Sequence, residues 1–368
     1  MKFIAFYLPQ FHEIKENNEW WGTGFTEWVN VKQGTPLFDG HYQPHVPYNN
    51  NYYDLIKDEN VFGKQIELAK KYGIDGFCFY HYWFKDGKKL LEKPVERFLD
   101  DKTLDISFCL SWANENWTRR WDGKEYEVLI SQDYDNEKGW FEHYEYLKKF
   151  FSDDRYLKDK FGRPIFIIYK PQEIPSIKMM LDSFNEWAMN DGFGGLCFVC
   201  QFPQKDVRIK KLFDYMIDFE PVETVMQWDL DLIKTILTPS LFLSFLKSKL
   251  YSDIGKRTYR VFDYRTFIKS SYRRKYKEKV WRGVFPGWDN TARRKLKADI
   301  YHNSTPKLFQ KYLEKQISNT LKTFSDDDSY IFVNAWNEWG EGAHLEPDEK
   351  YGFSYLESVK SARSKYRI

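Results

Sequence analysis

The feature of this sequence that most constrains its fold is a series of short, continuously apolar segments. Each segment is rich in β-branched and aromatic residues and is followed by polar or aromatic side chains, as is typical of strands. Apolar runs that do not alternate with polar residues indicate a parallel sheet that is buried on both faces. We predict strands over Phe3–Tyr7, Gly76–Tyr80, Ile106–Leu110, Ile165–Tyr169, Leu196–Val199, Tyr215–Phe219, Gly283–Phe285 and Tyr330–Val333.

Stretches with the apolar spacing of amphipathic helices lie between several of these strands. The first of them ends directly before Gly73, and glycine is the residue type that most often closes a helix. Regular alternation of helices with eight strands predicts an α/β protein with a (β/α)8 barrel of the TIM type. A doubly wound open sheet is the alternative. The predicted helices are Phe62–Tyr72, Trp140–Phe151, Ile177–Met189 and Pro306–Phe324.

Two regions depart from this alternation. Residues 11–60 form a long loop after the first strand, rich in Trp, Tyr, Asn, Pro and Gly, and long loops in compact domains are usually functional. Residues 222–280, approximately, form an insertion between the sixth and seventh strands. No repeat and no linker rich in Pro, Gly or Ser separates these regions from the rest. We therefore expect residues 1–368 to form a single catalytic barrel domain.

The amino-acid composition gives no support for a nucleic-acid partner and favours a carbohydrate ligand. The chain has 56 Lys and Arg against 54 Asp and Glu, so its net charge of +2 gives no support for binding nucleic acid. Aromatic residues make up 19% of the chain, including 14 Trp and 26 Tyr, whose polar groups need partners when buried. An aromatic-lined cleft for a carbohydrate substrate fits this composition.

The sequence predicts a cytoplasmic protein. Its first ten residues are too short a segment, and too soon interrupted by Pro9, to be a signal peptide. No run approaches the roughly 18 apolar residues that a membrane span needs. The basic segment from Arg273 to Lys279 has two interpretations. It is either a solvent-exposed helix face or a peripheral contact with anionic lipid or a diphosphate-linked glycan.

Barrel enzymes place their chemistry at the C-terminal ends of the strands. Polar and aromatic residues follow nearly all the predicted strands here. Glu27 is open to two readings, ligand binding or a structural salt bridge, and Glu115 lies between two amides that could bind sugar hydroxyls or hold a turn. A lone His at such a position is often simply packed. The predicted substrate-binding residues are Tyr7, Glu27, Trp28, His41, Tyr80, His81, Trp112, Asn114, Glu115, Asn116, Tyr169, Glu220, Trp288, Asn337 and Trp339.

Two carboxylates follow the eighth strand, Glu338 and Glu341, and they are the predicted catalytic residues. Paired acids are the usual means of cleaving or forming glycosidic bonds, because one donates a proton while the other acts as base or nucleophile. Burial beside Trp336 and Trp339 would raise the pKa of one acid and keep it protonated near neutral pH. From spacing alone, a helix-capping role for one of them stays open.

No metal or cofactor is predicted. The sequence has no His, Asp or Glu cluster with zincin or EF-hand spacing, and no Walker or dinucleotide-binding glycine pattern. Cys197 and Cys200 have the spacing of a metal or redox pair, but they lie in a predicted strand. Residues three apart in a strand point to opposite faces, so we interpret both as buried structural thiols.

Four long motifs follow one another along the chain: Ala5–His12, Trp20–Trp28, Leu110–Thr118 and Ala335–Gly342. In sequence and order they resemble those of the WbsX family of glycosyltransferases, which occur in bacterial surface-polysaccharide gene sets. That family is similar to glycoside hydrolase family 99. The resemblance covers nearly the whole chain and implies a (β/α)8 barrel and carbohydrate chemistry.

The hydrolase relatives are endo-α-1,2-mannosidases and mannanases with the motif Asn-Glu-Trp-His-Glu-Gly. The resemblance implies that Glu338 assists the sugar 2-hydroxyl in attacking the anomeric carbon, which gives an epoxide. It implies that Glu341 is the acid for the leaving group and then the base for the acceptor. Gly340 stands where those hydrolases have His, which puts mannose specificity in question.

We therefore expect an enzyme of polysaccharide or lipopolysaccharide biosynthesis that makes or remodels a glycosidic bond with retention. Its substrate would be an oligosaccharide, a sugar donor or a lipid-linked glycan. One alternative is an endo-acting glycoside hydrolase or transglycosylase of the endo-α-1,2-mannosidase type. Another is a glycan-binding barrel without catalytic activity.

Overall fold

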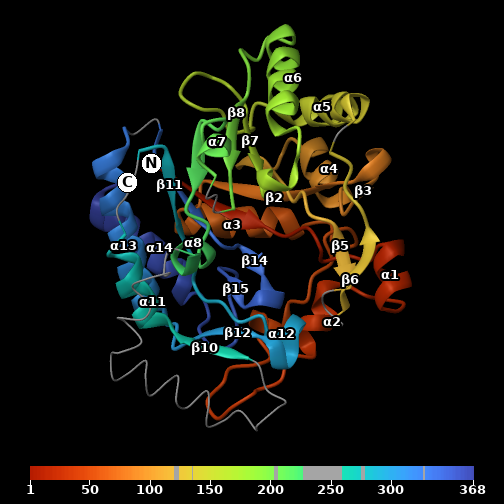
Figure 1. Ribbon diagram of the computed structural model, residues 1–368. Coiled ribbons are helices and arrows are strands. Elements are labelled where there is room, and N and C mark those ends of the chain that lie inside the picture. The colour runs from red at the N-terminus through yellow and green to blue at the C-terminus, as the bar shows by residue number, and fades with distance from the viewer. Residues whose placement is uncertain (120–123, 135, 203–205, 227–258, 275–277, 326–327) are drawn as a thin grey trace.

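A computed structural model of the chain describes residues 1–119, 124–134, 136–202, 206–226, 259–274, 278–325 and 328–368 (Figure 1). Its centre is a closed barrel of parallel strands. Strand β1 pairs with β13 on one side and with β2 on the other, so the sheet has no open edge. The predicted barrel is confirmed, and the open doubly wound sheet is excluded. The barrel strands are β1 (Lys2–Tyr7), β2 (Gly76–Trp83), β4 (Ser107–Trp112), β7 (Ile165–Ile168), β8 (Cys197–Cys200), β9 (Tyr215–Ile217), β11 (Val280–Val284) and β13 (Tyr330–Val333).

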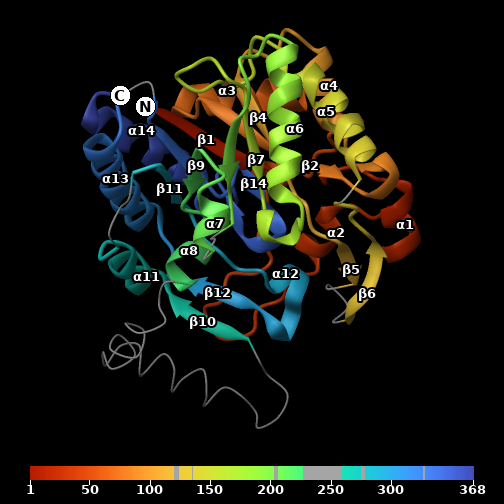
Figure 2. The same cartoon turned by 45° about the horizontal axis from the view of Figure 1, so that its top comes forward.

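Helices surround the barrel, and all four predicted helices are present (Figures 1 and 2). Helix α13 illustrates why they form. The Thr305 side chain accepts a hydrogen bond from the Leu308 N–H, and Pro306 occupies the first turn, where its missing N–H is not needed. The face of α13 that carries Phe309, Leu313 and Ile317 is buried. The surrounding helices are α3 (Val61–Tyr72), α4 (Lys93–Asp100), α5 (Glu137–Phe151), α6 (Ile177–Asn190), α7 (Val207–Lys210), α8 (Val222–Met226), α11 (Tyr264–Ser271), α12 (Thr291–Arg294), α13 (Pro306–Thr323) and α14 (Ser354–Tyr366).

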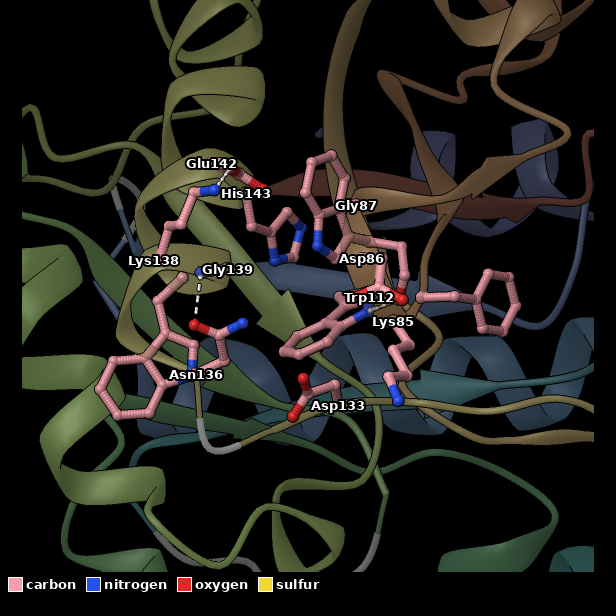
Figure 3. A pocket seen from close by; sticks show the side chains of 13 residues that line it. Lys85, Asp86, Gly87, Trp112, Asp133, Asn136, Lys138, Gly139, Glu142 and His143 are labelled. Carbon is pink, nitrogen blue, oxygen red and sulfur yellow. Dashed lines mark hydrogen bonds and ion pairs between the residues drawn. The ribbon is translucent and has the colours of Figure 1, made fainter.

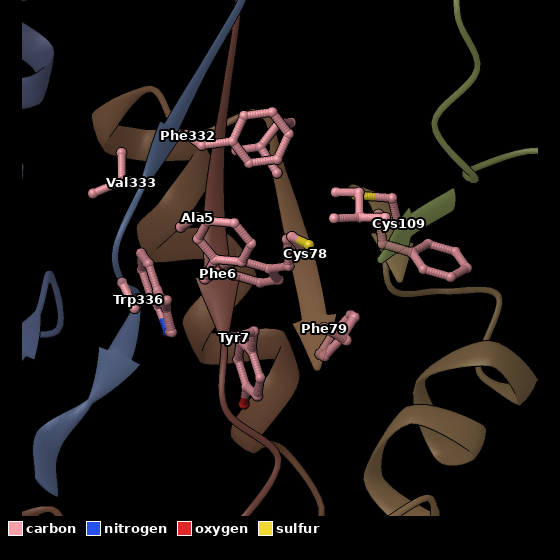
Figure 4. Packing of buried hydrophobic residues seen from close by; sticks show 14 of the residues in the cluster. Ala5, Phe6, Tyr7, Cys78, Phe79, Cys109, Phe332, Val333 and Trp336 are labelled. Carbon is pink, nitrogen blue, oxygen red and sulfur yellow. The ribbon is translucent and has the colours of Figure 1, made fainter. Parts of the chain in front are cut away.

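Alternate residues of each barrel strand face the interior and the helices. The Phe6 ring of β1 packs against Phe332 of β13 with centroids 5.5 Å apart, and against Tyr80 of β2 at 5.7 Å. Phe79, the neighbour of Tyr80, instead packs on Phe98 of α4. Figure 4 shows these strands side by side with their packed side chains. Because side chains alternate along a strand, whether a residue stands at an odd or an even position in its strand decides whether it can reach the barrel interior.

The long first loop is more structured than its sequence indicated. It contains two short helices, α1 (Lys15–Trp21) and α2 (Glu27–Lys32). Helices this short are marginal in water and depend on tertiary packing rather than on intrinsic propensity. In α2, Glu27, Trp28 and Val31 are buried, and both views of the molecule place α2 beside α12 (Figures 1 and 2). The first loop thus lies against the loop that follows β11.

The insertion is described only in part, because residues 227–258 lie outside the described ranges. Its described elements are α8, α11 and β10 (Arg260–Asp263), which pairs with β12 (Asp299–His302). In the basic segment Arg273–Lys279, residues 275–277 also lie outside these ranges. Arg273 and Lys279 are exposed, but Arg274 is only partly exposed: its side chain is 9% exposed and forms ion pairs with Asp218 and Glu220, both at 2.5 Å. For Arg274, the prediction of a solvent-exposed or lipid-binding side chain is therefore wrong.

Short strand pairs complete the described structure. Strand β3 (Lys89–Leu90) runs antiparallel to the end of β2, and β5 (Trp117–Arg119) pairs with β6 (Lys124–Ile130). After β13, β14 (Asn337–Glu338) pairs with β15 (Ala343–His344). Within the described ranges, no helix combines the length and the apolar character needed to cross a membrane.

The aromatic packing inside the barrel predicts a large stability effect for Phe332→Ala. Phe332 is 1% exposed and contacts the rings of Phe6 and Trp281. Removing it leaves a cavity, so the free energy of unfolding in urea should fall by about 3–5 kcal/mol. Phe161 is 71% exposed, and the matched change Phe161→Ala should alter the value by only about 0.5 kcal/mol. Equal losses would contradict this view of the core.

Candidate active site

The two predicted catalytic acids lie in a short, well-anchored segment after β13. Glu338 is the last residue of β14, and Glu341 is the last residue of the short 3-10 helix η7 (Trp339–Glu341). Gly342 ends η7 with a left-handed φ of 61°. The side chain of Asn337 fixes this segment to the chain just beyond β1. Its Oδ1 accepts from the Leu8 N–H at 2.7 Å, and its Nδ2 donates to the Leu8 carbonyl at 3.1 Å.

One buried guanidinium, that of Arg293, binds both acids and a third carboxylate. Nη2 lies 2.8 Å from Glu338 Oε1, and Nη1 lies 3.2 Å from Glu341 Oε1. Nε donates to Glu27 Oε1 at 2.7 Å. Arg293 belongs to α12 in the loop after β11, whereas Glu27 begins α2 in the first loop. Three separate loops at the C-terminal ends of β1, β11 and β13 therefore meet at one cation.

Gly340 makes room for this cluster. A Cβ atom at this position would lie 2.1 Å from Glu27 Oε1 and 2.8 Å from Arg293 Nε. Both separations are far shorter than van der Waals contact, so any other residue would displace the ion pair. The glycine that distinguishes this motif from the hydrolase motif is required by the arrangement of Glu27 and Arg293.

The charges of the cluster favour proton uptake. Burial raises the pKa of Glu338 to about 8; Arg293 lowers it, but the neighbouring Glu341 and Glu27 carboxylates raise it further. Burial also raises the pKa of Glu341, against the influence of Arg293. The side chain of Glu341 is 25% exposed and that of Glu338 is 8% exposed. At neutral pH the cluster therefore retains a proton on Glu338, the deeper acid.

A fourth carboxylate, Glu346, orients the two tryptophans of the motif. Oε2 accepts from the indole N–H of Trp339 at 2.7 Å and from the Tyr53 hydroxyl at 2.9 Å. Oε1 accepts from Trp336 at 3.2 Å and from Gln65 Nε2 at 2.6 Å. Four donors on one buried acid fix the direction of both indole rings.

Trp28 and His41 support the site from the first loop. The indole N–H of Trp28 donates to the Tyr53 carbonyl at 2.7 Å, and its ring packs on Trp339 with centroids 5.6 Å apart. His41 Nδ1 accepts from the Leu37 N–H at 3.0 Å, so Nε2 carries the proton and donates to Asp289 Oδ2 at 2.6 Å. Both side chains thus hold the loop in position.

Asp289 belongs to the same loop after β11 as Arg293, and its carboxylate is held in place by several hydrogen bonds. Besides His41, it accepts hydrogen bonds from Gln43 Nε2 at 2.8 Å and from the Thr291 hydroxyl at 2.5 Å. Burial raises its pKa, but the hydrogen bonds from His41 and Thr291 outweigh this and lower the pKa below the usual value. Asp289 is therefore ionised at neutral pH and anchors the first loop.

Three predicted aromatic residues are only partly buried. Tyr80 lies within β2, and Tyr169 and Trp288 follow β7 and β11. The Tyr80 and Tyr169 rings lie 6.5 Å apart in an edge-to-face arrangement, and the Tyr80 hydroxyl accepts from Gln201 Nε2 at 3.0 Å. These rings line the end of the barrel interior.

Three other predicted residues face outward, away from the acid cluster. The Tyr7 hydroxyl donates to Gln65 on α3 at 2.7 Å. His81 Nε2 lies 2.8 Å from His143 Nε2 on α5, and the Trp112 indole donates to the Trp83 carbonyl at 3.1 Å. Of the three, Trp112 lines a hollow of about 220 Å³, together with Trp83, Trp140, His143 and other residues (Figure 3). All three side chains stand at outward-facing positions of their strands and therefore point away from Glu338.

The remaining predicted residues hold loops. Asn114 exchanges hydrogen bonds with the backbone of Lys170, whose ammonium pairs with Glu115. Asn116 Oδ1 accepts from the Gln132 N–H at 2.6 Å. Glu220 pairs with Arg274 and accepts from the Thr224 hydroxyl at 2.6 Å; burial raises its pKa to about 7. These contacts engage the same polar atoms that sugar hydroxyls would need.

Arg293 is the main residue of the candidate site that the sequence did not reveal. It precedes Arg294, Lys295 and Lys297, a run that reads as a solvent-exposed basic surface. Its partner Glu27 is 266 positions away, so no local spacing links the two. Its place after the seventh strand was the one signal that could have drawn attention to it.

Comparison with known proteins gives a family and a fold. A family model described as glycosyltransferase WbsX matches residues 3–359. The protein WxcX of Xanthomonas campestris pv. campestris (strain B100) is 35% identical over 364 residues, which cover 98% of this chain and 49% of WxcX. WxcX of strain ATCC 33913 matches equally, also at 35% identity over 98% of this chain. The chain thus spans about half the length of the curated relatives that it matches.

Solved structures share the barrel. A GH99 endo-α-mannosidase from Bacteroides thetaiotaomicron superposes with a TM-score of 0.58 at 14% identity, covering 99% of this chain and 97% of that chain. A glycoside hydrolase-like protein gives a TM-score of 0.56 at 13% identity, covering 98% of this chain and 93% of that chain. At this level of identity the likeness establishes the fold alone.

The ion-pair cluster predicts a pH-dependent loss of stability in Arg293→Gln. Removing the cation leaves the buried Glu27 and Glu338 and the partly exposed Glu341 without it, which should cost about 3–5 kcal/mol of unfolding free energy. The loss should be larger at about pH 8.5 than at about pH 5, because the acids of the folded variant take up protons as pH falls. Urea unfolding at both pH values measures it.

The matched control is Arg260→Gln. Arg260 pairs with Asp299 at 2.6 Å, but its side chain is 69% exposed, so its removal should cost only about 0–1 kcal/mol at either pH. An Arg293→Gln protein as stable as this control at both pH values would show that the cluster contributes little.

Proposed function

The chain belongs to the WbsX glycosyltransferase family, and from this membership together with its site we propose that it forms or remodels a glycosidic bond during bacterial surface-polysaccharide assembly. The observation that carries the proposal is the pair Glu338 and Glu341 at the end of β13, bound by one buried guanidinium. Barrel enzymes use this end of the strands for catalysis.

Glycosidic bond chemistry needs a proton donor and a base or nucleophile. With a pKa of about 8, Glu338 is protonated at neutral pH and donates its proton to the departing oxygen. Glu341, the more exposed acid, serves as base or nucleophile at the anomeric carbon. The family resemblance implied the opposite roles. The two acids titrate as a coupled pair, and we assign the resting proton to Glu338 because it is the deeper one. Retention of configuration is part of this proposal.

Aromatic side chains supply the sugar-binding surface. We propose Tyr80, Tyr169 and Trp288 as direct contacts because they are partly exposed at three strand ends. An aromatic ring stacks well on the apolar face of a sugar, and the Tyr hydroxyls can bond its polar groups. Trp339 and Asn337 shape the floor through their contacts with Glu346 and Leu8. A cytoplasmic location, and contact of residues in Arg273–Lys279 other than Arg274 with anionic lipid, stay predictions.

The second candidate function is endo-acting glycoside hydrolysis. The likeness in fold to the GH99 endo-α-mannosidase favours it, since the same pair of acids could transfer a glycosyl group to water. The two functions differ in the acceptor, so the substrate that yields product distinguishes them.

The test is incubation with sugar nucleotides and lipid-linked sugars in one series, and with mannan-type oligosaccharides in another. Glycosyl transfer predicts product from the first series. Product from the oligosaccharides alone would overturn transfer in favour of hydrolysis. Binding of a glycan without turnover in either series would indicate a glycan-binding barrel.

Glu338→Gln and Glu341→Gln should each reduce kcat by at least about 100-fold while leaving sugar affinity within a few-fold of wild type. Gln keeps the shape and polarity of the side chain but neither donates nor accepts a proton in the reaction. Steady-state kinetics and calorimetric titration measure the two effects. The control Glu357→Gln, on the exposed face of α14, should leave both unchanged. Full activity in either site variant would contradict its assigned role.

The pH dependence of kcat/KM tests which acid holds the proton. Because the pKa of Glu338 is raised to about 8, the fraction of enzyme with a protonated donor falls as pH rises through that value. Activity should therefore decline on the alkaline side near pH 8, and this decline should be missing from the residual activity of Glu338→Gln. Persistence of the same decline in Glu338→Gln, with loss in Glu341→Gln, would assign the proton to Glu341.

A further inference from the structure

Three side chains from distant parts of the sequence converge beside the acid cluster without belonging to it. They are His45 in the first loop, and His344 and Asp348 in the segment after β13. His45 Nδ1 lies 2.9 Å from His344 Nε2, and Asp348 Oδ2 lies 4.0 Å from the same nitrogen. One ligand atom from each residue lies within 4.8 Å of the other two.

The hydrogen bonds of His344 determine which of its nitrogens is free. Nδ1 lies 2.9 Å from the Glu346 carbonyl, and a carbonyl can only accept, so Nδ1 carries the proton. Nε2 therefore presents a lone pair toward His45 Nδ1. Two ring nitrogens this close need a proton or a cation between them. Metal-binding histidines in proteins typically donate their other N–H to a carbonyl or carboxylate in this way.

Asp348 is oriented by the same kind of support. Its Oδ1 accepts from the Tyr351 N–H at 2.6 Å, which leaves Oδ2 directed toward His344. Asp348 and His344 are 3% and 4% exposed, whereas His45 is only partly buried. Two ligands are thus fixed and buried, and the third is partly exposed.

We propose that His45, His344 and Asp348 bind a divalent transition-metal ion of the Zn²⁺ type. Two imidazoles and one carboxylate suit Zn²⁺, whereas Mg²⁺ and Ca²⁺ prefer sites made of oxygen ligands. A tetrahedral ion with bonds near 2.05 Å places neighbouring ligand atoms about 3.3 Å apart. The observed separations of 2.9 and 4.0 Å lie on either side of that value, so small side-chain shifts complete the site.

The ion would clamp the first loop to the segment after β13. His344 stacks on Trp339 with ring centroids 3.7 Å apart and an interplanar angle of 14°. Fixing His344 therefore fixes the indole that lies between Glu338 and Glu341 in the sequence. The metal has a positioning role here, and its ligands are distinct from the three carboxylates that bind Arg293.

The test is metal binding by the purified chain after removal of metals with a chelator and dialysis. With Zn²⁺ added, the wild-type chain should bind one equivalent and its Tm should rise, because an ion that binds only the folded state stabilises it. Mg²⁺ or Ca²⁺ at the same concentration should leave Tm unchanged. Co²⁺ should give the intense visible absorption of a tetrahedral site.

Asp348→Asn and His45→Ala should weaken Zn²⁺ binding by at least about 100-fold, because a lost ligand costs more than the 10–100-fold of a lost supporting contact. Asn preserves the bond to the Tyr351 N–H, so this variant should stay folded. The control His302→Ala removes a partly buried histidine outside the cluster and should bind Zn²⁺ as the wild type does. Failure of the wild type to bind Zn²⁺, or equal binding by wild type and Asp348→Asn, would overturn the proposal.

Discussion

The ion pairs of Arg293 are the interaction on which the site depends. One cation faces three carboxylates, so the cluster carries excess negative charge whenever all three acids are ionised. Two unit charges about 5 Å apart repel by about 3 kcal/mol at an effective dielectric constant of about 20, which equals about two pKa units. Uptake of one proton removes much of this repulsion. The proposed proton donor thus depends on the excess of negative charge in this cluster.

The acids can be held in this way only because their loops cannot move independently. Asn337 ties the segment after β13 to the chain beyond β1, and Asp289 ties the loop after β11 to His41 and Gln43. Glu346 then fixes the indoles around the acids. Each of these groups is a buried polar residue whose bonds are made within the protein, so the network specifies one arrangement. Rigid support of this kind is what positions a proton donor to within a fraction of an ångström.

The sequence predicted the barrel because its strands are apolar on both faces and its helices carry the spacing of one buried face. Because both faces of each strand are apolar, the sequence did not show which side chains point inward. In a strand with two apolar faces, the pattern does not reveal which parity points inward, so Tyr7, His81 and Trp112 were predicted to line the site although they pack outward. Arg293 was missed because its partner lies 266 residues away. The sequence thus predicted which residues lie at strand ends. It did not predict the direction of their side chains or the ion pairs between residues far apart in the chain.

The resemblance drawn from the sequence puts His where this chain has Gly340. In this structure even a Cβ atom at residue 340 would collide with Glu27 and Arg293. A side chain there would therefore force the ion pair to shift. The glycine leaves room for a permanent cation that contacts both acids. Burial raises the pKa of both acids, Arg293 lowers both, and the neighbouring Glu27 carboxylate raises both again. One glycine thus couples the electrostatics of the acids to residues in two other loops.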